Sequence, residues 1–293
     1  MAERTLSERG DAGTEDGSVD RYVLGHAERE LDRLQLQARL LAPFTRQLLL
    51  EAGLRPGMRV LDVGSGAGDV ALLAAALVGV AGEVVGTDRS ADALATAAAR
   101  ASARGLRNVS FLAGDPTALA FARPFDAVIG RYVLMYQRDP GAMLARLVAR
   151  VRPGGVVAFH ESDWAGARSF PPVPSWDRCC QLVAETLRAS GADLYLGMRL
   201  HALFVGAGLP PPPLRYVTRV GAGREHVQAV TNPVVSLLPE MERLGLVSPG
   251  EVDPTTLLER VLADVTARGS IVVGWSEIGA WSTVPSPQPW CRR

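Results

Sequence analysis

The chain contains no lysine, so all 31 of its Lys and Arg residues are arginine. This absence excludes enzymes that form a Schiff base on a lysine, including those that bind pyridoxal phosphate in this way. It also excludes P-loop nucleotide hydrolases and dehydrogenases that use a Tyr-x-x-x-Lys pair. A GC-rich coding sequence alone would produce the same bias toward arginine.

Cysteine and histidine are scarce as well. Three cysteines, of which Cys179 and Cys180 are adjacent and Cys291 stands far away, do not form a disulfide framework or a metal site. The four histidines are widely separated and form no H-x-x-x-H pair: His26, His160, His201 and His226. We therefore expect no bound metal.

Excess charge of one sign and long apolar runs are also missing. The formal net charge is zero, which gives no electrostatic reason to expect a nucleic-acid or anionic-membrane partner. Residues 1–20 are acidic and polar, unlike a signal or transit peptide, and no apolar run approaches the length of a membrane span. We expect a cytoplasmic protein with a disordered tail at residues 1–20.

The most informative stretch that is present runs from Val60 to Asp69. An apolar run ends in Asp62, a glycine cluster follows, and a segment rich in alanine and leucine comes next. This order predicts a strand, a tight loop and a helix. Glycines in such a loop allow a ligand to approach the backbone closely, and the start of the helix presents free N–H groups to that ligand.

The spacing of the glycines narrows the choice of ligand. A dinucleotide fold favours G-x-G-x-x-G, but here Asp69 stands at the position of its third glycine. The observed G-x-G-x-G after an acidic strand end resembles motif I of the class I S-adenosylmethionine (SAM) methyltransferases. The resemblance implies SAM as the cofactor and a set of binding residues in this loop: Asp62, Gly64, Ser65, Gly66 and Gly68.

Strands and helices alternate through the first half of the chain. The predicted strands are residues 58–62, 83–87, 108–112, 125–129 and 156–159, with helices at 67–80, 91–103 and from Asp139-Pro140 to just before Pro153. Strict alternation predicts an α/β fold with a mostly parallel sheet and helices on both faces. The order resembles the Rossmann-like, seven-stranded methyltransferase sheet, whose seventh strand is antiparallel.

The remaining segments predict additions to this core. Residues 21–54 form an amphipathic helix that we interpret as a lid, and the core at 55–165 resumes with a helix and strand at 197–222 and a last strand at 269–285. Helical insertions at 166–196 and 223–268 would form a substrate cap, in which Asn232-Pro233 and Asp253-Pro254 each predict a helix start. Residues 286–293 are expected to be loose. A lid of this kind could also mediate a homodimer.

Further cofactor residues are predicted at the ends of the next strands. Asp88, followed by Arg89, stands about twenty residues after the glycine loop, where an acid can accept both ribose hydroxyls. By resemblance, Asp115-Pro116 lies near the adenine amino group and Arg131 near the amino-acid carboxylate, while Tyr22 would reach the cofactor from the lid. Alternative roles are helix capping for Asp88 and an Asp-Pro turn for Asp115.

The acceptor side is predicted from the ends of the fourth and fifth strands and from the insertions. We expect the substrate to be a small, partly hydrophobic metabolite that contacts Tyr132, Met135, Tyr136, Trp164 and Trp176. His160, Glu161 and Asp163 follow the predicted fifth strand and are candidate general bases, with His26 on the lid as a weaker candidate. His160 could equally be a structural histidine.

Several alternatives stay open at this point. A nicotinamide-dependent oxidoreductase, a SAM-binding protein without turnover and an enzyme that couples cyclisation to methylation are each compatible with a glycine loop and an acid after the second strand. The sequence does not distinguish an oxygen, nitrogen or carbon acceptor.

Overall fold

The computed structural model describes residues 28–286, with side chains described from residue 40 onward. Eight strands form one sheet, seven of them in the order β3-β2-β1-β4-β5-β8-β6. The eighth strand, β7, pairs with β8 on the edge opposite β5. The first five of these elements run parallel, whereas β8 is antiparallel to β5, β6 and β7. Their bounds are β1 Arg59–Val63, β2 Glu83–Asp88, β3 Val109–Ala113, β4 Phe125–Arg131, β5 Val151–Asp163, β6 Arg168–Phe170, β7 Leu214–Gly221 and β8 Ile271–Thr283.

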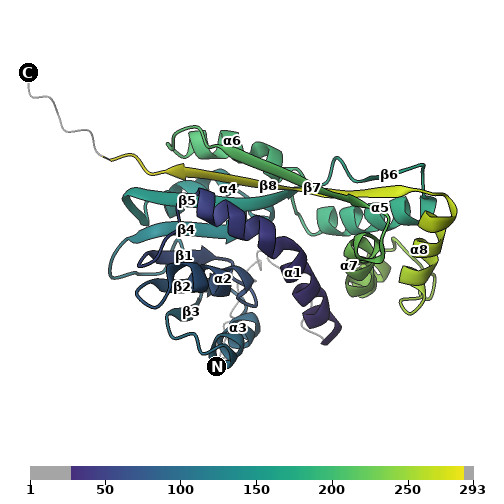
Figure 1. Ribbon diagram of the computed structural model, residues 1–293, viewed down its shortest axis with the longest axis horizontal. Coiled ribbons are helices and arrows are strands. Elements are labelled where there is room, and N and C mark those ends of the chain that lie inside the picture. The colour runs from purple at the N-terminus through teal and green to yellow at the C-terminus, as the bar shows by residue number, and fades with distance from the viewer. Residues whose placement is uncertain (1–27, 287–293) are drawn as a thin grey trace, which may run out of the picture.

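Helices cover both faces of this sheet (Figure 1). Side chains alternate across the strands, so that Val60 belongs to a core cluster with α1 and α2, whereas Leu61 belongs to a second cluster with α4 and α6. The helices are α1 Glu28–Glu51, α2 Asp69–Val78, α3 Ala91–Ala103, α4 Pro140–Val148, α5 Pro174–Ala189, α6 Leu196–Gly206, α7 Arg224–Arg243 and α8 Leu257–Ala267, with a short 3-10 turn η1 at Leu134–Tyr136.

A separate group of helices, which we call the helical unit, lies beyond one end of the sheet. There α5, α7 and α8 contact one another, and the long strand β8 runs from this unit into the sheet (Figure 1). Helix α1 crosses from α2 to α7 and thereby contacts both parts. The two predicted insertions therefore fold together, next to the carboxyl end of β5.

The predicted α/β fold class and the antiparallel last strand are confirmed, while several boundaries are wrong. The sheet has an additional short strand, β6, because β8 extends far enough past β5 to pair with residues 168–170. Asn232 and Pro233 lie inside α7, whose N-cap is Gly223, so they do not start a helix. Helix α8 begins at Leu257, after a turn in which Asp253 accepts hydrogen bonds from Thr255 and Thr256.

The longer fifth strand has consequences for the candidate bases. Strand β5 continues to Asp163 because residues 160–163 pair with β8, from Gly279 to Ser276. His160, Glu161 and Asp163 are therefore part of the sheet instead of following it, and all three side chains are buried. No helix in the described part of the chain has the length and apolar character needed to cross a membrane.

Candidate active site

The glycine loop follows β1 as predicted and is shaped by left-handed backbone. Gly64, Gly66 and Gly68 have φ values of +62°, +50° and +86°, which side-chain-bearing residues rarely adopt. A Cβ on Gly64 would lie 2.7 Å from Val133, and one on Gly68 would lie 2.9 Å from the Cβ of Ala97. A Cβ on Gly66 would have no described atom within 4 Å, so the space above this residue is open.

Two polar atoms under the loop are buried without a partner among the described residues, namely Asp62 Oδ2 and Ser65 Oγ. Burial raises the pKa of the Asp62 carboxyl to about 8, and nearby Asp88 and Asp69 act in the same direction, whereas Arg131 and the backbone amide of Ala71 oppose the shift. A buried polar atom without a partner is costly, so these two atoms favour a polar or cationic ligand at the loop.

Asp88 ends β2 beside the same loop. Its carboxylate accepts hydrogen bonds from the Gly66 amide at 2.8 Å and from the Ser90 amide at 2.9 Å. The N-cap of α3 is Ser90, whose hydroxyl accepts from Ala93, so Asp88 does not have the capping role considered as its alternative. Asp88 thus fixes the loop, and each of its oxygens retains capacity for a further donor.

The other predicted cofactor residues lie around this edge of the sheet. Asp115 accepts a hydrogen bond from the Thr117 amide at 2.7 Å, which is the turn geometry considered as an alternative to ligand binding, and Pro116 is buried. Arg89 is exposed. Arg131 lies 3.5 Å from Asp69, the first residue of α2, and its other terminal nitrogen is 3.4 Å from the Thr45 hydroxyl. Tyr22 and His26 are outside the described residues.

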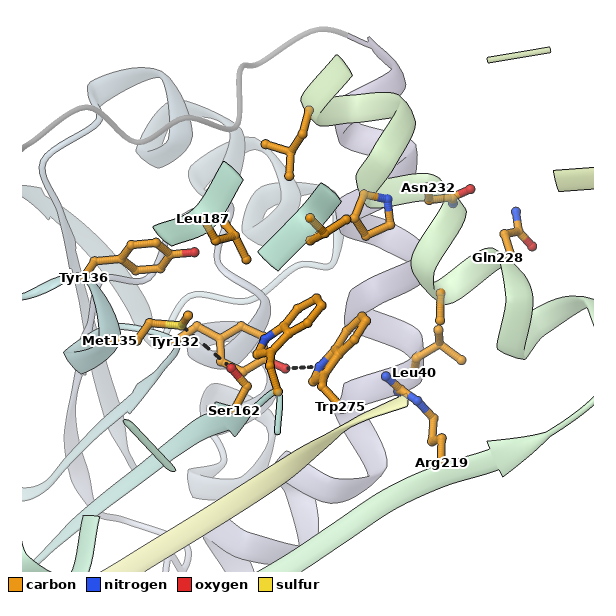
Figure 2. Close-up of a pocket in the computed structure, with 15 residues that line it drawn as sticks. Leu40, Tyr132, Met135, Tyr136, Ser162, Leu187, Arg219, Gln228, Asn232 and Trp275 are labelled. Carbon is orange, nitrogen blue, oxygen red and sulfur yellow. Dashed lines mark hydrogen bonds between the residues drawn. The ribbon is translucent and has the colours of Figure 1, made fainter. Parts of the chain in front are cut away.

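A cavity opens next to this edge, between the sheet and the helical unit. Figure 2 shows its walls, which include Tyr132, Met135 and Tyr136. Trp164, the fourth candidate substrate contact here, also lines the cavity. The indoles of Trp164 and Trp275 are stacked, with 4.5 Å between centroids and 12° between planes. Leu40 of α1 and Arg219 of β7 also contribute. The cavity is therefore mostly apolar and aromatic, with a few polar groups.

Trp176 does not have the predicted place in the cavity. It is completely buried in the core cluster on α5 and does not line the cavity. The sequence shows an aromatic residue on an amphipathic helix but does not show which face of that helix meets the core. We therefore remove Trp176 from the candidate substrate contacts.

His160 lies behind the cavity wall, where it is 1% exposed. Its Nε2 is 3.0 Å from Glu277 Oε2 and its Nδ1 is 3.1 Å from the Thr45 hydroxyl, and Phe44 packs against the ring. Burial lowers the pKa of His160 below its usual value, against the opposing effect of Glu277. The imidazole does not contact the cavity directly.

Glu161 and Asp163 have structural partners. Glu161 Oε1 accepts hydrogen bonds from the amides of Val133 at 3.0 Å and Leu134 at 2.8 Å, and so fixes the turn that follows β4. Burial raises the pKa of Glu161 to about 8, although these backbone hydrogen bonds oppose the shift. Asp163 accepts from the Ala165 amide at 3.2 Å. Neither residue lines the cavity.

The sequence analysis missed Glu277, the carboxylate that connects these groups. Glu277 is 3% exposed and receives hydrogen bonds from the Tyr132 hydroxyl at 2.5 Å and the Trp275 indole at 3.0 Å, in addition to the contact with His160. Arg219 lies 3.7 Å away. One feature of the sequence could have indicated Glu277, namely that it is a single acid inside an otherwise apolar predicted strand.

Comparison with known proteins identifies related sequences. A family model described as a methyltransferase domain matches residues 54–190. The aklanonic acid methyltransferase DauC of Streptomyces sp. strain C5 is 36% identical over 144 residues, which cover 49% of this chain and 64% of that protein. The nocamycin O-methyltransferase of Saccharothrix syringae is 40% identical over 118 residues, covering 40% of this chain and 42% of that protein. The match thus spans less than two thirds of either relative.

Solved structures also resemble the fold. The YcgJ protein of Bacillus subtilis aligns with a TM-score of 0.55 and 17% sequence identity, covering 83% of this chain and 99% of that one. At this identity the likeness concerns the arrangement of strands and helices alone.

Proposed function

We propose that the protein, whose residues 54–190 match a methyltransferase-domain family model, is a class I SAM-dependent methyltransferase that transfers a methyl group from SAM to a small, partly hydrophobic metabolite of secondary metabolism. The two small-molecule methyltransferases reported above support this substrate class. SAM supplies an activated methyl group, so the protein has to align an acceptor with it and exclude water.

The cradle at the carboxyl end of β1 carries this proposal. Open space above Gly66, two buried polar atoms without a described partner and the half-buried carboxylate of Asp88 meet at one edge of the sheet. The N-terminus of α2 adds a partial positive charge. This combination fits a ligand with a nucleoside hydroxyl pair and a charged amino-acid end.

Each group has an assigned role in this proposal. The glycine loop lies against the cofactor, Asp88 accepts the ribose hydroxyls, and Asp115 accepts from the adenine amino group. Arg131 attracts the amino-acid carboxylate, while Asp62 lies under the loop and favours the cationic amino group. The acceptor occupies the aromatic cavity beyond Tyr132.

Asp69 argues against the nicotinamide alternative. Its carboxylate stands at the first position of α2 and is paired with Arg100 at 2.6 Å and with Arg131 at 3.5 Å. A dinucleotide pyrophosphate at this helix start would meet a carboxylate where the dinucleotide motif has glycine. The matched methyltransferase family favours SAM for the same loop.

Helix α1 is the proposed lid. Leu40 lines the cavity and Thr45 contacts His160, so this helix is part of the walls on the acceptor side. Deletion of residues 1–20 should preserve methyl transfer, whereas deletion through residue 29 should abolish it. Equal activity of the two truncated chains would contradict the lid.

Binding of S-adenosylhomocysteine (SAH) tests the cofactor assignment. We expect Gly66→Val to weaken SAH binding at least ~10-fold by calorimetry, a loss of about 1.4 kcal/mol, because its side chain enters the open cradle. Gly269→Val is the matched control, since Gly269 has a φ of +58° and also no described atom within 4 Å of a Cβ. Both variants should lose similar stability, about 1–2 kcal/mol, from left-handed backbone. Equal SAH affinity of the two variants would refute the assignment.

A further inference from the structure

Resting on the proposed function, we infer that the methyl acceptor is an aromatic or enolic hydroxyl whose proton passes through Tyr132 to Glu277. This role for Glu277 differs from direct catalysis by His160. It is derived from the hydrogen bonds, burial and charges around the cavity wall.

Tyr132 lines the cavity, as do Trp275 and Arg219, whereas His160 and Glu277 do not. The Tyr132 hydroxyl donates to Glu277 Oε2 at 2.5 Å. The Trp275 indole nitrogen lies 3.4 Å from the same hydroxyl, and this second contact is drawn in Figure 2. Because the hydrogen of Tyr132 is directed at Glu277, its oxygen offers a lone pair toward the cavity. An acceptor hydroxyl can donate to that lone pair.

Glu277 is held as a proton acceptor by donors on its other sides. An ionised carboxylate only accepts, so His160 must present Nε2–H to Oε2 while Trp275 donates to Oε1 at 3.0 Å. With the His160 ring neutral, its Nδ1 carries no proton and faces the Thr45 hydroxyl at 3.1 Å, a hydroxyl that also lies 3.1 Å from the Leu41 carbonyl and shares its single proton between the two acceptors. His160 is thus a positioning residue that orients Glu277, and Tyr132 is the residue that contacts substrate.

The proton and electron balance is complete. The acceptor O–H bond breaks as its proton moves to the Tyr132 oxygen, and the original proton of Tyr132 moves to Glu277 Oε2. The acceptor oxygen bonds to the methyl carbon while the C–S bond breaks and leaves its electron pair on sulfur. Tyr132 stays neutral throughout, which agrees with a pKa that burial and Glu277 raise well above its ordinary value. After product leaves, the proton returns to water by the reverse path.

The charges of the wall select a neutral acceptor. Glu277, behind Tyr132, and Arg219, which lines the same cavity, are 3.7 Å apart and compensate each other's charge, so the wall offers no net charge to a carboxylate or an ammonium group. A hydroxyl carries neither charge. The stacked pair of Trp164 and Trp275 forms a flat apolar wall, against which a planar ring can lie.

The backbone places Tyr132 between the two ligands. Tyr132 has a φ of +56°, and its amide donates to the His160 carbonyl at 2.9 Å. On one side Arg131 is paired with Asp69 at the start of α2, and on the other side Val133 packs where Gly64 has no Cβ. A strained residue held on both sides by the cofactor loop is suited to contact the reacting oxygen.

Two probe acceptors test the inference with labelled SAM, namely 1-naphthol, which must lose a proton, and 2-naphthoate, which is already ionised. We expect Tyr132→Phe and Glu277→Gln to lower kcat for 1-naphthol by about 10²–10⁴-fold. Methylation of 2-naphthoate should not fall in either variant, because that acceptor needs no base, and it should rise in Glu277→Gln, because this variant removes the anion that repels a carboxylate. SAH affinity should be preserved in both variants.

The matched control is Tyr216→Phe. Tyr216 accepts a hydrogen bond from Ser276 at 2.6 Å, and Ser276 neighbours Glu277 on β8 but points to the opposite face. This variant should methylate 1-naphthol like the wild type. Circular dichroism melting identifies any variant that fails to fold, and Tyr132→Phe tests the relay if Glu277→Gln is unstable.

A pH profile separates a relay from a structural effect. The charged or titratable groups facing Glu277 are Tyr132, His160 and Arg219, with Arg131 nearby. Wild-type kcat for 1-naphthol should be nearly constant around neutral pH, whereas kcat of Tyr132→Phe should rise with the fraction of ionised naphthol. In His160→Gln, which keeps Tyr132 and Glu277, kcat for 1-naphthol should not rise with the fraction of ionised naphthol.

The outcomes are distinguishable. Normal kcat for 1-naphthol in Tyr132→Phe, or equal losses for both probes, overturns the relay while leaving methyl transfer intact. Methylation of 2-naphthoate but not of 1-naphthol by the wild type overturns the hydroxyl acceptor. Failure of the wild type to bind SAH overturns the proposed function, and the relay with it.

Discussion

Asp62 leads to a prediction that requires no knowledge of the acceptor. Burial raises its pKa to about 8, so at pH 7 roughly nine tenths of the molecules carry a proton on this carboxyl. A cation within about 4–6 Å lowers a carboxyl pKa by about 1–3 units. Binding of SAH, whose amino group is cationic, should therefore release about 0.4–0.9 proton per site at pH 7.

Calorimetry in two buffers measures this release directly. The apparent binding enthalpy should differ between phosphate and Tris at pH 7 by the released fraction multiplied by the difference in buffer ionisation enthalpy. The affinity for SAH should rise as the pH approaches 8, because a larger fraction of the free protein has then already lost the Asp62 proton. Asp62→Asn should abolish the buffer dependence.

Glu161→Gln is the matched control for Asp62→Asn, since it removes the second buried carboxyl whose pKa is raised to about 8. Its hydrogen bonds go to the turn after β4 and not to the glycine loop. Proton release should persist in this variant. A binding enthalpy independent of the buffer in the wild type, or the same release in Asp62→Asn, would refute the coupling of Asp62 to the cofactor cation.

Two further predictions concern stability. Because the pKa of Glu161 is raised, its contribution to stability is complete below about pH 4.5 and is lost as the pH rises through about 8. Melting temperatures between pH 5 and 8.5 should therefore fall less steeply for Glu161→Gln than for the wild type. Parallel melting curves of the two proteins would contradict this prediction. Trp176→Leu should lower the free energy of unfolding by about 3 kcal/mol in urea titrations while leaving the KM for 1-naphthol unchanged. Trp164→Leu should do the reverse, and a raised KM in Trp176→Leu would restore that residue to the substrate site.

Local patterns predicted the local structure around the glycine loop well. The glycine loop, the acid after β2 and the cap of α3 lie within short segments, and parallel strands place their carboxyl ends at one edge. The long last strand was also predictable from its apolar run. For these elements, the strand order alone predicts which side chains lie near the glycine loop.

The acceptor side depends on pairings between distant segments. Glu277 and His160 are 117 residues apart, and they meet only through the antiparallel register of β5 and β8, which places Glu277 opposite Ser162. A shift of one residue would turn Glu277 to the other face. The same pairing extends β5 and buries the acids that were expected at its exposed end. The pattern of apolar residues along the sequence does not show which residues of β5 and β8 pair with each other.

Helix starts within the cap illustrate a different limit. Asn-Pro is typical of an N-cap followed by N1, but α7 runs through Asn232 and Pro233 from its N-cap at Gly223. Buried residues before this proline, Val227 and Val230, continue the apolar face that packs against α5. Packing of that face outweighs the interruption that proline causes in the helix hydrogen bonds.

The turn after β4 shows how the two parts of the site are held in one geometry. Glu161 fixes the amides of Val133 and Leu134, the His160 carbonyl accepts from the Tyr132 amide, and Glu277 holds the Tyr132 hydroxyl. Left-handed backbone at Tyr132 costs about 1–2 kcal/mol, and these hydrogen bonds from β5 and β8 offset that cost. Because Val133 also packs against Gly64, a displacement of this turn would move the cofactor loop and the acceptor wall together. In a transfer that depends on alignment, a rigid turn shared by both ligands fixes the distance between them.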